Sequence, residues 1–105
     1  MYITPDQAKR NLAINLWWNL SHQKGRTGYA WLATELSKRY PTRIYTSRIQ
    51  KVLEQTCSPD WAFVVNLADI LHISVEDLGK EPTAAMIKAY ELKFGAKGRD
   101  MAHSA

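Results

Sequence analysis

Residues 32–53 read LATELSKRYPTRIYTSRIQKVL, and they place two short helix-like segments on either side of a basic connector, residues 37–41. In both segments the apolar residues recur at intervals of three and four, which is the spacing of one helix face. They are Leu32, Ala33 and Leu36 before the connector and Ile49, Val52 and Leu53 after it. The stretch therefore predicts two helices joined closely, with five basic side chains around the joint.

The same periodicity continues on both sides of this stretch. It predicts helices over about 5–22, 28–38, 43–55, 59–71, 75–79 and 83–94. Several starts carry local signals: Thr4-Pro5-Asp6-Gln7 has the form of a capping box, Ser58 and Ser74 have the form of N-caps, and Pro82-Thr83 opens the last segment. No stretch alternates like a strand or contains a two-residue hairpin turn, so the predicted fold class is all-α.

The first predicted helix, about 5–22, has apolar residues on two faces. Leu12 and Leu16 lie on one face, and Ile14 and Trp18 lie roughly 200° around the helix from them. One packing partner cannot cover both faces. The last helix, with Met86, Tyr90 and Phe94, is the favoured cover for the second face because its own apolar stripe also needs a partner; a second subunit is the alternative.

Composition excludes several classes of protein and site. The single Cys57 permits neither an internal disulfide nor a zinc site built from several thiolates. His22 and His72 have no second ligand at helical spacing, and no nucleophile, acid–base pair or phosphate loop is found. We therefore predict no enzyme activity, no metal and no cofactor. Trp17, Trp31 and Trp61 are predicted to lie in the core.

The chain contains neither a secretory signal nor an apolar run of about 18 residues, the length that a membrane span requires. A cytoplasmic protein without a membrane partner is therefore the expectation. The net charge is +4. Between residues 24 and 51 there are seven basic residues and one acid, and between residues 52 and 81 there are six acids and one basic residue. If the fold gathers residues 24–51 on one face, that face suits phosphates; an uneven solvated surface is the alternative.

The helix pair and its basic joint together predict a helix-turn-helix, whose second helix enters the major groove of DNA. Thr42 is predicted as the N-cap of that helix, and Arg43 is placed in its first turn. The residues predicted to contact bases are Arg43, Tyr45, Ser47 and Arg48. Those predicted to contact phosphates are Lys24, Arg26, Lys38, Arg39, Thr42 and Lys51.

The chain resembles the lambda-repressor-like helix-turn-helix family, also called XRE/Cro-type, over about residues 8–79. The resemblance lies in Leu32-Ala33, in SRIQ at residues 47–50 and, most specifically, in LADILHISVEDL at residues 67–78. It implies a compact five-helix domain, here with an additional C-terminal helix. Ser37 stands where the family usually has glycine, and the connector is about three residues longer. Whether Ile44 or Tyr45 faces outward is therefore left open.

The expected organisation is a DNA-binding domain over 1–79, a C-terminal helix over 80–94 that packs or dimerises, and a disordered tail over 95–105. The expected function is that of a sequence-specific regulator of the repressor type, resembling those of phages and mobile elements, that binds double-stranded DNA as a homodimer. The alternative is an antitoxin-like or adaptor module that binds another protein. Its interface would be the face of Ile14 and Trp18 together with the last helix.

Overall fold

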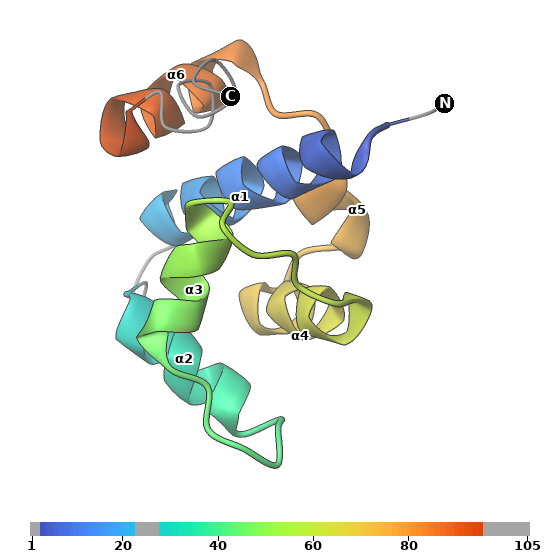
Figure 1. The fold of residues 1–105 in the computed structure, drawn as a ribbon, viewed down its shortest axis with the longest axis vertical. Helices are drawn as coiled ribbons and strands as arrows, with labels where there is room; N and C mark the ends of the chain where they lie inside the picture. The colour runs from blue at the N-terminus through green and yellow to red at the C-terminus, as the bar shows by residue number, and fades with distance from the viewer. Residues whose placement is uncertain (1–2, 23–27, 96–105) are drawn as a thin grey trace.

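The computed structural model describes residues 3–22 and 28–95. These residues form six helices and no strand: α1 (Pro5–His22), α2 (Tyr29–Ser37), α3 (Thr46–Leu53), α4 (Trp61–Leu71), α5 (Val75–Gly79) and α6 (Ala84–Phe94) (Figure 1). The all-α prediction is confirmed. No helix in the described ranges is both long and apolar enough to cross a membrane. The predicted phosphate contacts Lys24 and Arg26, and the tail from residue 96 onward, lie outside the described residues.

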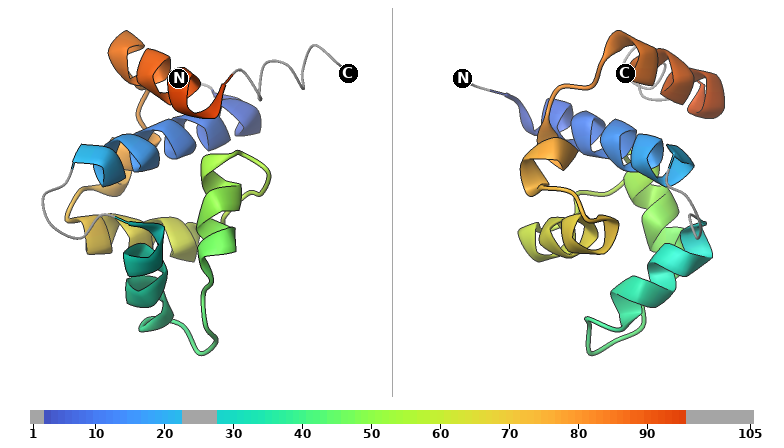
Figure 2. Two further views of the ribbon diagram at one scale, coloured as in Figure 1. Left: turned by 90° about the vertical axis from the view of Figure 1, so that its left-hand side faces the viewer. Right: turned by 180° about the vertical axis from the view of Figure 1, so that it is seen from behind.

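Helix α1 runs through the middle of the molecule (Figures 1 and 2). Helix α6 lies on one side of it, whereas α2, α3 and α4 lie on the other, and α5 packs near its N-terminal end. Leu12, Leu16 and Leu20 face the larger core, which is shared with α2 to α5. Ala13 and Ile14 form a second core cluster with Met86 and Tyr90 of α6. The two-faced helix is thus covered on both sides within one chain.

The apolar residues predicted to pack against a tail or a second subunit therefore pack against each other. Ile14, Met86 and Tyr90 are buried, and Trp18 and Phe94 are partly buried against them. The Trp17 ring meets both Tyr90 and Phe94 edge-on, at centroid distances of 6.1 Å. This is the fold-back arrangement, and it makes internal the face that the protein-interaction alternative would use.

Local capping sets most of the helix starts. The Thr4 hydroxyl accepts a hydrogen bond from the Gln7 backbone N–H (3.1 Å), and the Gln7 side chain accepts one from the Thr4 N–H (2.9 Å), as the capping box predicts. The hydroxyls of Ser74 and Thr83 each cap a helix, α5 and α6, by accepting one bond, from the N–H groups of Asp77 and Met86. The prediction that Ser58 is an N-cap is wrong. Asp60 is the N-cap of α4, and its carboxylate accepts a hydrogen bond from the Phe63 N–H at 2.8 Å.

A buried asparagine fixes the path of the chain from α5 to α6. The Asn15 side chain is 1% exposed, and its amide donates to the carbonyls of Leu78 (3.0 Å) and Lys80 (2.8 Å). One turn earlier, Asn11 donates to the Gly79 carbonyl at 3.3 Å. Carbonyls at a helix C-terminus lack intrahelical donors, and the side-chain amides of Asn15 and Asn11 act as donors to them. α1 thereby holds the end of α5 and the start of the segment that carries α6 over its second face.

Trp61 was predicted to lie in the core, but the buried face of α4 does not include it. Phe63, Leu67 and Ile70 are buried, whereas Trp61 is 69% exposed and Val65 is 40% exposed. The prediction of a core position is therefore wrong for Trp61, although Trp17 and Trp31 do pack partly buried against the core. α4 is apolar on most sides, so its periodicity alone cannot tell which stripe the other helices cover.

Candidate nucleic-acid interface

Helix α3 has one buried and one exposed face. Ile49, Val52 and Leu53 are buried and attach it to the core, as predicted. The exposed residues of α3 and of the position that follows it are Thr46, Ser47, Gln50, Lys51 and Glu54. This face carries hydroxyl, amide and amine groups, with the Glu54 carboxylate at its end, and no large apolar side chain. Such groups can form hydrogen bonds with base edges or with phosphates.

The start of α3 differs from the prediction. Thr42 is not its N-cap and Arg43 is not in its first turn, because the helix begins at Thr46 with Tyr45 as the N-cap. Ile44 is 4% exposed and Tyr45 is 62% exposed, so Tyr45 faces outward.

The cause is a contact with the end of α2. The Ser37 hydroxyl accepts a hydrogen bond from the Ile44 N–H at 2.8 Å and donates one to the Ala33 carbonyl at 2.8 Å. Because Ile44 is held in this way while its side chain enters the core, the backbone before Thr46 stays extended.

In the structure the connector between α2 and α3 spans residues 38–45, in place of the predicted 37–41. It projects beyond the two helices (Figures 1 and 2). Its first half is attached to α4. Arg39 forms an ion pair with Asp69, and the Tyr40 hydroxyl accepts a hydrogen bond from the Asn66 amide at 3.4 Å. The Tyr40 ring also lies 6.4 Å, centroid to centroid, from that of Phe63. The joint between the two helices is therefore longer than predicted but braced against the body of the molecule.

The basic residues that were predicted to contact DNA differ in exposure and in their partners. Lys38 pairs with Glu35 at 2.9 Å, and Arg39 pairs with Asp69. Arg48 was expected to face outward but is half-buried, and its guanidinium lies 4.6 Å from the centre of the Phe63 ring. Arg43 and Lys51 are exposed, and the Arg43 guanidinium lies 5.3 Å from the centre of the exposed Tyr45 ring. Of the predicted basic contacts in the described residues, Arg43, before α3, and Lys51, near its end, are exposed and form no ion pair with another described residue.

The N-termini of α2 and α3 differ from those of the other helices. Their N-cap residues, Gly28 and Tyr45, make no side-chain hydrogen bond to the first turn. By contrast, α1, α4, α5 and α6 are capped by Thr4, Asp60, Ser74 and Thr83. The first N–H groups of a helix have no intrahelical acceptor and favour an anion. The two uncapped helices are the two of the predicted DNA-binding pair.

The C-terminal end of α3 is held by α6. Gln55, two residues beyond the helix, has a positive φ of 63°, a conformation that is uncommon for a residue other than glycine. Its amide donates to the Tyr90 hydroxyl at 3.1 Å, and that hydroxyl in turn donates to the Leu53 carbonyl. The C-terminal helix thereby stabilises the end of α3 as well as covering α1.

We expect Tyr90→Phe to destabilise the protein at pH 7 by about 1–2 kcal/mol, because the Leu53 carbonyl and the Gln55 amide lose their partner. Burial raises the pKa of the Tyr90 phenol above 10.0, its usual value; the hydrogen bond from Gln55 opposes this rise and Glu54 adds to it. Since the pKa is higher in the folded state, the corresponding stability is present below pH 10 and is lost as the pH rises through the folded pKa. Urea unfolding above pH 10 should therefore depend less on pH in the variant.

Tyr29→Phe is the matched control. Burial and then Glu54 raise the pKa of the Tyr29 phenol as well, so this variant should also reduce the alkaline loss. It should change the free energy of unfolding at pH 7 by less than about 0.5 kcal/mol. Equal stability of wild type and Tyr90→Phe at pH 7 would contradict the role of Tyr90 at the end of α3.

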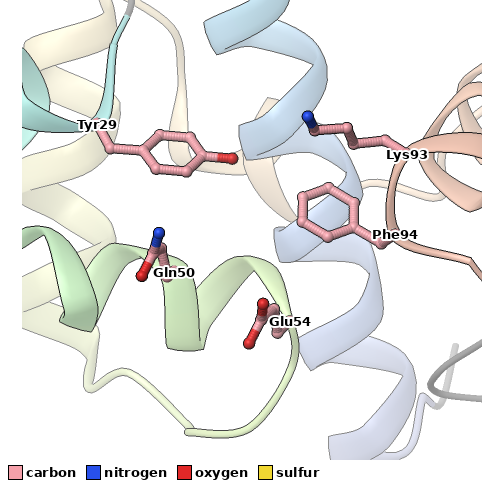
Figure 3. Close-up of a pocket in the computed structure, with 5 residues that line it drawn as sticks. All are labelled: Tyr29, Gln50, Glu54, Lys93 and Phe94. Atoms are coloured by element: carbon pink, nitrogen blue, oxygen red, sulfur yellow. The ribbon is translucent and has the colours of Figure 1, made fainter.

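An open pocket of about 360 Å³ borders the exposed face of α3. It is lined by Tyr29 of α2, by Gln50 and Glu54, and by Lys93 and Phe94 of α6 (Figure 3). The Tyr29 hydroxyl and the Lys93 amine extend into the same gap from opposite sides. The end of α6 therefore lies beside α2 and α3. Among the described residues, no three His, Cys, Asp or Glu side chains are grouped so that they could hold a metal ion.

Comparison of the chain with models of known families, with curated proteins and with solved structures finds no match. Function is therefore inferred from the geometry of α2, α3 and the connector. The sequence did not identify Thr46 and Gln50 as candidates, although both are exposed on α3. Gln50 lies one residue after Ile49 and two before Val52, a spacing that places it off the buried face and could have indicated its exposure. Thr46 lies three residues before Ile49, so its spacing alone places it on the buried side.

Proposed function

We propose that the protein binds double-stranded DNA by placing α3 in the major groove, and that it acts as a transcriptional regulator of the repressor type by occupying an operator. The observation that carries this proposal is the two-sided character of α3. Ile49, Val52 and Leu53 attach one side to the core, while the other side is polar, exposed and uncapped at its start. An exposed arginine, Arg43, lies just before that start.

The exposed groups on and near α3 are suited to different contacts with DNA, some to base edges and others to phosphates. The Gln50 amide can form two hydrogen bonds with an adenine, and the hydroxyls of Thr46 and Ser47 can bond to base edges or phosphates. Lys51 and Arg43 offer charges to the phosphates on either side of the groove. The N–H groups at the start of α3 add a partial positive charge that favours a phosphate.

The paired cations have a different place in this proposal. Lys38 and Arg39 would have to exchange Glu35 and Asp69 for a phosphate, so their contribution to affinity should be smaller than that of Lys51. Arg48 would have to leave the Phe63 ring to reach a base. We infer that Arg48 mainly holds α3 against α4, which makes it a positioning residue and not a base contact.

The direct test is selection of bound duplexes from a random pool with the full chain, followed by sequencing and by gel shifts at two salt concentrations. A shared sequence motif and a steep loss of affinity with salt are expected. A symmetric motif would mean that two copies bind together. Failure to retard any duplex at low salt would contradict the proposal and favour a module that binds only proteins.

Lys51→Ala should weaken binding to selected and random duplexes alike. Removal of one phosphate contact should also reduce the slope of log affinity against log salt by about 0.9. Lys88→Ala is the control, since Lys88 is also exposed but belongs to α6, across α1 from α3. If the two variants changed the slope equally, the effect would be due to net charge, and Lys51 would have no specific role.

A further inference from the structure

The outward face of α4 is apolar over its first two turns. Trp61, Ala62 and Val65 are all exposed, and Trp61 and Val65 lie one turn apart on the same side of the helix. The other large apolar side chains that are exposed in the described residues lie in three separate places: Ile3 before α1, Tyr45 in the connector and Leu92 on α6. Exposed apolar residues that gather on one face, in contrast to scattered ones, indicate an interaction surface.

We propose that this face binds a second copy of the chain, with the two α4 helices antiparallel and Val65 on the two-fold axis. This contact would form the dimer surface when two copies bind a symmetric DNA site, and in that respect the proposal rests on the proposed function. The contact itself requires no DNA, and it can be tested in its absence. Failure of the dimer and failure of DNA binding are therefore separate results.

Charge and spacing favour a second copy over an unrelated partner. Asp69 lies on the same face as Val65 and Trp61, at equal spacing beyond Val65, and Arg39 is bound to it. Antiparallel pairing about Val65 places each Trp61 opposite the Arg39–Asp69 pair of the other copy. A guanidinium over an indole ring is a favourable cation–π contact, and Asp60, adjacent to Trp61, adds an opposite charge for Arg39.

The contact is compatible with the rest of the fold. Tryptophan and arginine are the residue types that most often dominate binding energy at interfaces. The exposed residues of α3 take no part in the contact, and Phe63 faces Arg48 and the core while Trp61 and Val65 face solvent. Because few residues per copy are involved, we expect weak association that depends on protein concentration.

Sedimentation equilibrium of the full chain without DNA, at concentrations up to about 1 mM, provides the first test. Wild type should associate reversibly, and Trp61→Lys should raise the dissociation constant at least about tenfold. Leu92→Lys, which places the same charge at another exposed apolar site, on α6, should leave it unchanged. A wild type that stays monomeric throughout, or an equal effect of both variants, would overturn the proposal.

Cross-linking tests the register. A residue on a two-fold axis meets its own copy, so Val65→Cys in a Cys57→Ser background should form a disulfide-linked dimer on oxidation. The control, Leu92→Cys in the same background, should cross-link at least about tenfold more slowly, and adding Trp61→Lys should slow the Val65→Cys reaction. Equal rates for positions 65 and 92 would overturn the antiparallel α4 contact, whatever the result with DNA.

Discussion

Replacement of Phe63 by alanine should lower the free energy of unfolding by about 3–5 kcal/mol. Phe63 is 0% exposed, and its ring contacts both Tyr40 of the connector and the Arg48 guanidinium of α3. The substitution leaves a cavity in the core and also removes the surface on which these two side chains rest. Loss of DNA binding should accompany the loss of stability, because α3 and the connector are held against α4 through this ring.

The matched control is Trp61→Ala, two positions earlier on the same helix. It removes a larger ring, but Trp61 is 69% exposed, so we expect a loss of less than about 1 kcal/mol. Urea unfolding should be followed by circular dichroism, since Trp61 contributes to fluorescence, and at low protein concentration, where association adds little. Similar losses for the two variants would contradict the orientation of α4.

Asn15→Ala should destabilise the protein by about 2–3 kcal/mol, since the carbonyls of Leu78 and Lys80 lose their donor. The side-chain oxygen of Asn15, Oδ1, is itself buried without a hydrogen-bond partner in the described part of the chain, and its removal offsets a small part of the loss. Because these bonds set the path from α5 to α6, amide hydrogen exchange should show α6 losing protection more than α2. Urea unfolding measures the total.

Asn19→Ala controls for the residue type and the helix. The Asn19 side-chain amide donates at 2.8 Å to the backbone carbonyl of Asn15 within α1 itself, and alanine has the higher helix propensity. We expect a change of less than about 0.5 kcal/mol and no selective effect on α6. If Asn15→Ala lowered the free energy of unfolding by as little as Asn19→Ala, its two bonds to the Leu78 and Lys80 carbonyls would not be what holds α6 in place.

Features that depend on neighbours along the chain were predictable. The Thr4 and Gln7 capping box and the cap at Ser74 each join residues three positions apart. Helical spacing likewise identified the buried face of α3, because Ile49, Val52 and Leu53 are its only large apolar residues. Such patterns require no knowledge of what packs against the helix.

Features that depend on distant residues were not predictable. The start of α3 follows from the Ser37–Ile44 hydrogen bond together with burial of Ile44. Arg39 is paired because Asp69, thirty positions later, lies beside it. The positive stretch found along the sequence is therefore partly neutralised in space, by carboxylates that include one from the acidic half of the chain.

By itself, then, the sequence determined that six helices form, where most of them start and which side of α3 is apolar, because periodicity and capping act within a few residues. Only the tertiary structure decided which stripe of α4 is buried, which arginines stay exposed and what covers the second face of α1. Those outcomes depend on which surfaces the assembled helices bring together. Phe63 and Trp61 are both aromatic residues of one apolar helix, and only their neighbours make one a core residue and the other a surface residue.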